Sequence, residues 1–136
     1  MPAFPKTPSA RKLLLVDDDR TFAQIAARAL VRRGFDVAVA HDVNSAIGLA
    51  ASNTSYALVD LVLGDTSGLG LLEPLKAKNP SMRIVVLSGY ASIETIMDAI
   101  RHGATHFLAK PVDADQIVAA LTNGEPSALH VGSHAR

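Results

Sequence analysis

The sequence predicts an α/β protein: a doubly wound, five-stranded parallel sheet of order 2-1-3-4-5, covered by five helices. Three observations lead to this prediction. Short continuous apolar runs alternate five times with segments in which apolar residues recur every three or four positions. Runs this apolar are typical of parallel strands that are buried on both faces. The chain has 136 residues, 49% of them hydrophobic, which suits one domain of roughly 100–150 residues.

The expected elements follow one another along the chain without a long interruption. Each apolar run precedes a helical pattern, and turn residues separate the two. The sequence therefore predicts strands at residues 13–16, 37–40, 56–59, 84–87 and 106–109, and helices at residues 22–30, 43–50, 69–75, 93–100 and 114–121.

Helix ends are marked by residues with known capping chemistry. Gly34 and Gly103 lie just beyond two helical patterns, where a left-handed residue commonly ends a helix. Ser92 is expected to cap the fourth helix. Asp113, with Gln116 three residues later, resembles a capping box that opens the fifth.

Composition excludes several classes of function. Thirteen basic and thirteen acidic side chains balance, so the chain lacks the basic signature of a nucleic-acid or membrane-surface binder. It has no cysteine, and no stretch approaches the roughly 20 apolar residues of a membrane helix. A cytoplasmic protein is expected. Residues 1–10 and 124–136 lack periodicity and are expected to be tails, the second a tail or truncated linker, around one domain at 11–123.

Polar side chains gather at the carboxyl ends of the predicted strands. Asp17 and Asp18 follow the first strand, and Asp60, Ser88 and Lys110 follow the third, fourth and fifth. Ligands of doubly wound sheets bind at this edge, where the strand order reverses and the first and third strands are neighbours. Because neighbouring strands lie about 4.8 Å apart, the three aspartates are expected to share one small pocket.

This pocket has the chemistry of phosphoryl transfer. Carboxylates about 4 Å apart repel by roughly 1 to 4 kcal/mol per pair, which favours a raised pKa or a bound cation. Oxygen ligands without His or Cys suit Mg²⁺. Asp60 is then the expected nucleophile that forms an acyl phosphate. Lys110 would neutralise charge on the phosphoryl group, and Ser88 would donate to one of its oxygens.

These residues resemble those of response regulator receiver domains, the CheY-like proteins of flavodoxin-like topology. The family's acidic pair, phosphorylated aspartate, hydroxyl residue and Lys-Pro dipeptide are matched by Asp17-Asp18, Asp60, Ser88 and Lys110-Pro111. The resemblance covers about residues 11–123. It implies a signalling protein rather than an enzyme, phosphorylated on Asp60 by a sensor histidine kinase with Mg²⁺ as cofactor.

The resemblance also implies roles for individual residues. Ser88 and Phe107 would be the switch residues that shift the face made by the fourth helix, fifth strand and fifth helix. That helix borders the family's output surface, but we expect its stripe of Ile93, Ile96, Met97 and Ile100 to pack in the core. The metal ligands would be Asp17, Asp18, Asp60 and the main-chain carbonyl of Val62.

Two features of this chain depart from the family's usual pattern. Gly64 stands where a proline is frequent, so the loop at 61–68, closed by Gly68, is expected to be more flexible. The switch aromatic, Phe107, lacks the hydroxyl of a tyrosine.

The segments DLVLGDTSGL and SGYASIETIMDAIRHGATHFLAKP are similar to the PrrA, RegA and ActR type of regulator. That type adds a helix-turn-helix domain that binds DNA. The 13 residues after Asn123 are too few for one, so we expect a single-domain regulator or a receiver cut from a longer protein. The output partner and any phosphorylation-dependent dimer stay open, and this chain is expected to bind neither nucleic acid nor membrane.

Two alternatives remain. The segment LLLVDDDRT also fits the signature of haloacid dehalogenase-like phosphatases, with Asp17 as nucleophile and Asp19 as acid/base. That interpretation leaves Asp60 unexplained and offers only Asp113 and Asp115 as the later acidic pair, while Asp19 is also a natural helix cap. The second alternative is a receiver-shaped module that acts only through protein contacts, although every expected site residue is present.

Overall fold

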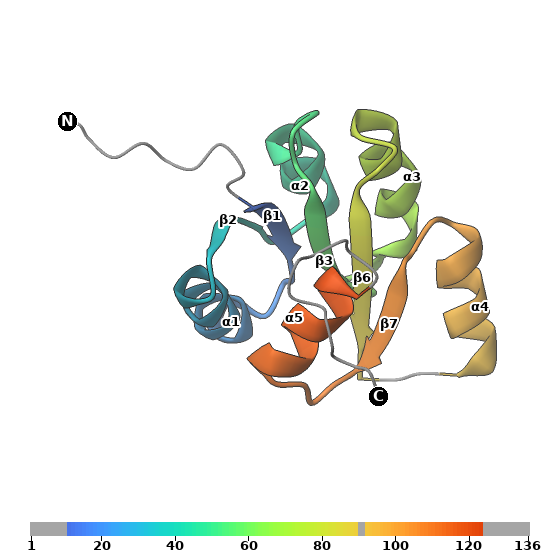
Figure 1. Cartoon of the computed structure of the whole chain (residues 1–136). Coiled ribbons are helices and arrows are strands. Elements are labelled where there is room, and N and C mark those ends of the chain that lie inside the picture. Colours follow the sequence, from blue (N-terminus) through green and yellow to red (C-terminus); the bar gives the residue numbers. More distant parts are fainter. Residues whose placement is uncertain (1–10, 90–91, 124–136) are drawn as a thin grey trace.

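The computed structural model describes residues 11–89 and 92–123. The main sheet has the order β2-β1-β3-β6-β7 with parallel pairs throughout, which confirms the predicted order of five strands (Figure 1). The elements of these residues are β1 (Arg11–Val16), α1 (Arg20–Arg32), β2 (Phe35–Ala40), α2 (Val43–Leu49), β3 (Tyr56–Asp60), β4 (Val62–Leu63), β5 (Thr66–Ser67), α3 (Leu69–Lys78), β6 (Arg83–Ser88), α4 (Ile93–Arg101), β7 (His106–Ala109) and α5 (Ala114–Thr122).

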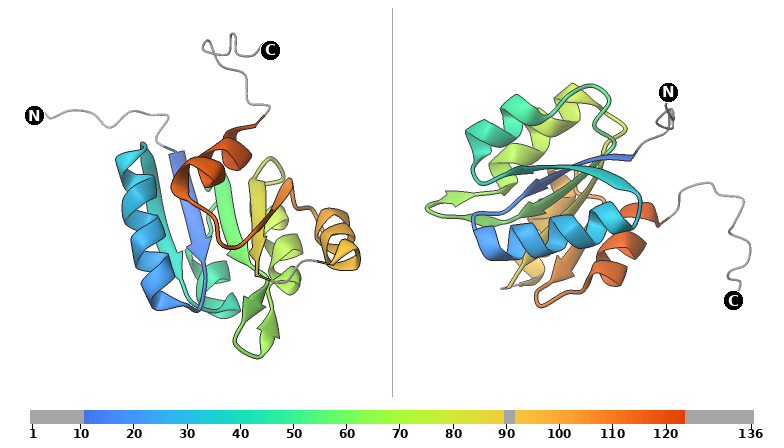
Figure 2. Two further views of the ribbon diagram at one scale, coloured as in Figure 1. Left: turned by 90° about the horizontal axis from the view of Figure 1, so that it is seen from below. Right: turned by 90° about the vertical axis from the view of Figure 1, so that its left-hand side faces the viewer.

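The core has two halves, one on each face of the sheet. Alternate residues of a strand point to opposite faces, so Leu14 and Val16 of β1 pack with α2 and α3, while Leu13 and Leu15 pack with α1 and α5. The right panel of Figure 2 shows these helix pairs on opposite sides of the sheet. β3 is buried along its whole length, from Tyr56 to Asp60. Burial on both faces explains why the central strands are continuous apolar runs.

The predicted helix caps are confirmed. Asp19 accepts a hydrogen bond from the N–H of Phe22 at the start of α1, and Ser92 caps α4 in the same way. Asp113 and Gln116 form the predicted capping box of α5. The backbone just beyond α1 and α4 is left-handed, with φ of 97° at Gly34 and 110° at Gly103.

A short hairpin after β3 was not predicted. β4 and β5 pair antiparallel through Val62 with Ser67 and Leu63 with Thr66, and the hairpin projects beyond the sheet (Figure 2). Its strands have two residues each, too few to show an alternating pattern in the sequence. Gly64 turns the chain with a φ of 65°. The segment expected to be a flexible loop therefore contains ordered backbone pairing.

The expected core packing of the α4 stripe is wrong. Ile93, Met97 and Ile100 are 76%, 48% and 55% exposed, whereas Ala99 is fully buried and Ile96 is half-buried. The sheet lies against the side of α4 that carries Ala99, so the apolar stripe is rotated away from it. Helical spacing locates an apolar face but does not show what covers it.

Within residues 11–89 and 92–123, none of the helices combines the length and hydrophobicity needed to cross a bilayer. The expected tails at 1–10 and 124–136 lie outside the described residues.

Candidate functional site

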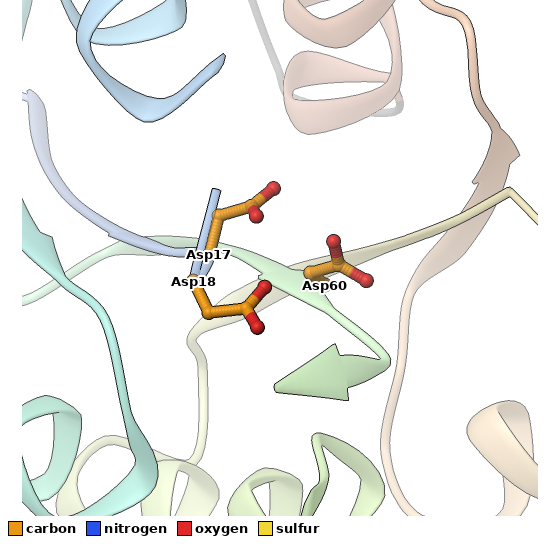
Figure 3. A group of neighbouring side chains, drawn as sticks. All are labelled: Asp17, Asp18 and Asp60. Atoms are coloured by element: carbon orange, nitrogen blue, oxygen red, sulfur yellow. The ribbon is translucent and has the colours of Figure 1, made fainter. Parts of the chain in front are cut away.

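The strand register brings the three predicted aspartates together. β1 and β3 pair in parallel up to Val16 opposite Val59, so Asp17 and Asp60, the next residue of each strand, end at the same level. Asp18 follows at the same edge. Ligand oxygens of all three carboxylates lie within 4.8 Å of one another, and Figure 3 shows the side chains side by side. Asp17 is fully buried and Asp60 is 6% exposed, whereas Asp18 faces solvent.

Main-chain N–H groups orient each carboxylate. Asp60 Oδ1 accepts from the N–H of Val62 at 2.9 Å, inside the turn that leads into the hairpin. Asp18 Oδ2 accepts from the N–H of Gly64 at 2.8 Å, and Asp17 Oδ1 accepts from the N–H of Asp19 at 2.9 Å. The segment after β3 therefore hydrogen-bonds to both Asp60 and Asp18 and holds their carboxylates near each other. These bonds fix the directions of the carboxylates before any ligand arrives.

Lys110 closes the site from β7. Its Nζ donates to Asp60 Oδ2 at 2.7 Å and to Asp17 Oδ2 at 3.0 Å. The Nζ also lies 4.4 Å from the centroid of the Phe22 ring, in the geometry of a cation–π contact. The main-chain N–H of Lys110 donates to Ser88 O at 2.9 Å, and the Lys110-Pro111 peptide bond is cis. One ammonium group thus holds two carboxylates and contacts one aromatic ring.

The electrostatics of the site show the cost of confining these charges. Burial raises the pKa of Asp17 above its usual value of 3.8, and the nearby Asp60 charge raises it further. The hydrogen bonds from Asp19 and Lys110 oppose this shift without cancelling it. Burial by itself would lower the pKa of Lys110, but its hydrogen bonds to Asp60 and Asp17 outweigh burial and raise that pKa. The lysine therefore stays charged and offsets part of the carboxylate repulsion.

The two predicted switch residues lie on neighbouring strands. Ser88 is 2% exposed at the end of β6, one position beyond Leu87, the residue opposite Asp60. Phe107 lies on β7, opposite Val86 of β6. It is half-buried and packs against the part of the core beneath α2 and α3. The register puts Ser88 at the same edge as the acidic cluster and Phe107 farther down the sheet.

Apart from Asp17, the acidic residues that the phosphatase interpretation needs are engaged elsewhere. Asp19 caps α1 through Phe22, as its position before the helix predicted. Asp113 caps α5, and Asp115 forms an ion pair of 3.1 Å with Arg33 on the outer surface. Neither Asp113 nor Asp115 belongs to the acidic cluster found among the described residues. The later acidic pair of that interpretation is therefore not assembled at Asp17.

Sequence reasoning missed three residues that shape the site. The sequence pattern indicates only that Phe22 is an apolar position of a helix, yet its ring contacts Lys110. The sequence pattern indicates only that Gly64 is a loop residue, yet its N–H donates to the Asp18 carboxylate and orients it. His41 follows β2, and its Nδ1 donates to the main-chain carbonyl of Asp17 at 2.9 Å. These contacts join segments that are distant in sequence, and no local pattern signals them.

The arrangement fits a divalent metal ion. Three converging carboxylates provide hard oxygen ligands, and the exposed Asp18 leaves one side open to solvent. Lys110 approaches the cluster from β7 and neutralises only part of the charge. The site can therefore hold a cation beside the Asp60 carboxylate.

Comparisons with known proteins identify the family to which the chain is similar. The chain matches the response regulator receiver domain family over residues 13–122. It is 45% identical over 115 residues to the photosynthetic apparatus regulatory protein RegA of Rhodovulum sulfidophilum, which covers 83% of this chain and 63% of RegA. It is 44% identical over 112 residues to the acid tolerance regulatory protein ActR of Sinorhizobium medicae, which covers 82% of this chain and 58% of ActR. The chain thus spans about three fifths of these relatives.

A solved structure is similar in both sequence and fold. A response regulator from Burkholderia pseudomallei, crystallised with a phosphorylated aspartic acid, a calcium ion and citrate, is 44% identical with a TM-score of 0.79. The match covers 83% of this chain and 67% of that one. The chemotaxis protein CheY4 of Vibrio cholerae, 23% identical with a TM-score of 0.77, has the same fold. The chain therefore belongs to the response regulator receiver domain family, the phosphoryl-accepting domains of two-component signal transduction.

Proposed function

We propose that Asp60 is the residue that accepts the phosphoryl group. One observation carries this assignment: the Asp60 carboxylate lies inside the acidic cluster, 2.7 Å from Lys110 Nζ. A carboxylate oxygen of Asp60 attacks the phosphorus atom of the donor. The bond from phosphorus to the donor nitrogen or oxygen breaks, and an aspartyl phosphate remains. The N–H of Val62, which donates to Oδ1, supports the orientation of the nucleophile.

The metal in this proposal is Mg²⁺, held by Asp18, Asp60 and the main-chain carbonyl of Val62, with Asp17 beside them. The three carboxylates supply the oxygen ligands that a hard ion prefers. When bound, the ion neutralises charge on the transferring phosphoryl group. Lys110 contributes a second positive charge from the β7 side, and Ser88 donates from the end of β6.

The phosphoryl donor in this proposal is the phosphohistidine of a sensor histidine kinase, and the output is a conformational change. Ser88 moves toward the phosphoryl group, and Phe107 turns inward into the space that this movement frees. The two movements shift the population of the face made by α4, β7 and α5. The exposed Ile93, Met97 and Ile100 give that face an apolar surface suited to a protein partner. Control of transcription through a separate DNA-binding domain is the proposed output.

Labelling with acetyl phosphate tests the acceptor. Intact mass spectrometry should show one added phosphate in the presence of Mg²⁺ and none with Asp60→Asn. The matched control is Asp65→Asn, because Asp65 is an exposed aspartate of the neighbouring hairpin turn and should label like wild type. Unchanged labelling of Asp60→Asn would reject the assignment.

Calorimetric titration with Mg²⁺ tests the ligands. Asp18→Ala should weaken binding by at least about tenfold, because it removes one of the few protein oxygens on the ion. Asp19→Ala should leave the affinity within about twofold, because Asp19 caps α1 and is not in the cluster. Equal losses in the two variants would mean that the metal site is misplaced.

A further inference from the structure

We propose that a groove between α1 and β2 is a binding site for a small organic phosphate. The groove has a volume of about 390 Å³, within the range of small-molecule sites. β2 is the edge strand of the main sheet, and α1 lies alongside it (Figure 1). The lining residues are Arg20, Gln24, Ala27, Arg28, Val39 and His41.

Helical geometry aligns the polar groups of the groove. Arg20, Gln24 and Arg28 follow one another at intervals of four residues, so they form one stripe on α1. His41 faces this stripe from the end of β2. Two guanidinium groups, one amide and one imidazole therefore converge on the same space.

The arginines of this stripe are not held in ion pairs. Within residues 11–89 and 92–123, neither Arg20 nor Arg28 forms an ion pair or a side-chain hydrogen bond. By contrast, Arg33 pairs with Asp115 and Arg101 pairs with Asp98. α1 itself contains no acidic residue. Guanidinium groups bind phosphate oxygens through paired N–H donors, so an anion with phosphate geometry matches the stripe.

His41 is held in place by a bond that leaves its other ring nitrogen unused. Nδ1 donates to the main-chain carbonyl of Asp17 at 2.9 Å, which fixes the ring where it lines the groove. Nε2 makes no hydrogen bond to the described part of the chain. A fixed ring loses little conformational freedom when a ligand binds.

The surroundings indicate where the anion should lie and what else the ligand should contain. The Asp42 carboxylate caps α2, and the hydrogen bonds from Ser45 are the main cause of its lowered pKa. The charges of His41 and Arg20 lower that pKa further, so Asp42 lies close to both residues. That negative charge disfavours an anion at the Arg20 end and places it near Arg28. Ala27 and Val39 supply apolar surface, which favours a phosphate attached to an apolar group over inorganic phosphate.

The groove is distinct from the acidic cluster. None of Asp17, Asp18 and Asp60 lines it, and the hydrogen bond between His41 and the main-chain carbonyl of Asp17 connects the two sites. Binding in the groove therefore requires neither phosphorylation nor a metal ion, and the inference does not depend on the proposed role of Asp60.

The test is an amide NMR titration of the chain with phenylphosphonate in the presence of EDTA. The carbon–phosphorus bond of this probe prevents phosphoryl transfer, and EDTA removes metal that could recruit it to the aspartates. Saturable shifts should map to residues 20–28 and 39–41. Arg28→Gln should weaken binding about tenfold, the effect of losing one charged hydrogen-bonding group.

The matched control is Arg32→Gln, because Arg32 is also an exposed arginine of α1 but does not line the groove. It should leave the affinity within about twofold. Benzyl alcohol and inorganic phosphate should each bind more weakly than phenylphosphonate. Equal binding of either one, equal losses in the two arginine variants, or shifts confined to other residues would overturn the proposal.

Discussion

At the scale of single residues, Lys110 organises the resting site. Its ammonium group contacts Asp60, Asp17 and the Phe22 ring, and these partners come from three different elements or their ends. The sequence predicted that Lys110 and Asp60 lie at the same edge of the sheet, and the structure shows them in contact at 2.7 Å. The contacts with Asp17 and Phe22 add two groups whose effects can be measured separately.

The first prediction concerns Asp17. Burial raises the pKa of its carboxyl group above 3.8. Between pH 3.8 and that raised value, the folded state binds more protons than the unfolded state, so stability falls as pH rises through this window. Asp17→Asn removes the cost of burying the charge, and Lys110 keeps its bond to Asp60. Metal-free Asp17→Asn should therefore be more stable than wild type at pH 7, and the difference should shrink toward pH 4.

Urea unfolding in EDTA from pH 4 to pH 7 measures this effect. The control is Asp36→Asn, which breaks an exposed pair with Lys12 and should change the free energy of unfolding by less than about 1 kcal/mol. If Asp17→Asn is instead less stable at pH 7, attraction to Lys110 outweighs burial.

The second prediction concerns the contact between Phe22 and Lys110. A cation–π contact of this length contributes about 0.5–1 kcal/mol at a partly exposed site. A double-mutant cycle with Phe22→Leu and Lys110→Met should give a coupling energy of this size in the free energy of unfolding. In the control cycle, a substitution of Phe35 takes the place of Phe22→Leu. The Phe35 ring lies against Arg11 and Tyr56, so its coupling energy with Lys110→Met should be near zero. Equal coupling in both cycles would show a general loss of packing.

At the scale of elements, local chemistry set the helix ends, and tertiary contacts set the hairpin and the orientation of α4. The caps at Asp19, Ser92 and Asp113 depend on residues three positions apart, so the sequence was sufficient to predict them. The β4–β5 hairpin depends instead on close backbone contacts. The N–H of Gly68 donates to Leu61 O at 2.8 Å, which closes the segment against β3.

The third prediction concerns that close approach. A Cβ atom on Gly68 would lie 2.2 Å from Asp60 O and 3.1 Å from a methyl group of Val59, so the backbone at Asp60, the proposed acceptor, would have to move. Gly68→Ala should lower the free energy of unfolding by about 1–3 kcal/mol and slow labelling with acetyl phosphate. Gly70→Ala is the control, because its Cβ meets nothing within 4 Å in α3, and it should raise stability by up to about 1 kcal/mol. Similar losses in both variants would exclude the close approach as the cause.

At the scale of the whole molecule, the parallel sheet places side chains from the ends of four strands at one edge. Asp17, Asp60, Ser88 and Lys110 are spread over 94 residues, yet β1, β3, β6 and β7 end together. Lys110 directly follows β7, which forms the proposed output face together with α4 and α5. A change at Asp60 can therefore reach α4 and α5 through a single strand.

The fourth prediction tests this connection. In the proposed mechanism the metal ion already supplies positive charge at the phosphoryl group, so Lys110→Ala should still accept phosphate from acetyl phosphate, at a reduced rate. Its phosphorylated form should not show the amide NMR shifts on residues 92–122 that wild type shows. Lys12→Ala, at the opposite end of the sheet, should label and shift like wild type. A loss of labelling of 10²-fold or more would instead assign Lys110 mainly to transition-state stabilisation. Normal labelling with wild-type shifts would refute both roles.

The sequence by itself determined the fold class, the strand order, the helix caps and the residues that gather at the carboxyl edge. Hydrophobic periodicity and capping are local, and parallel βαβ connections leave few ways to arrange five apolar strands. Only the tertiary structure decided that Lys110 also binds Asp17, that Gly64 orients Asp18, and that the apolar stripe of α4 faces outward. It also assembled Arg20 and Arg28 of α1 with His41 into one groove. The physical reason is that these contacts depend on the distances between packed elements, which residue spacing along the chain does not specify.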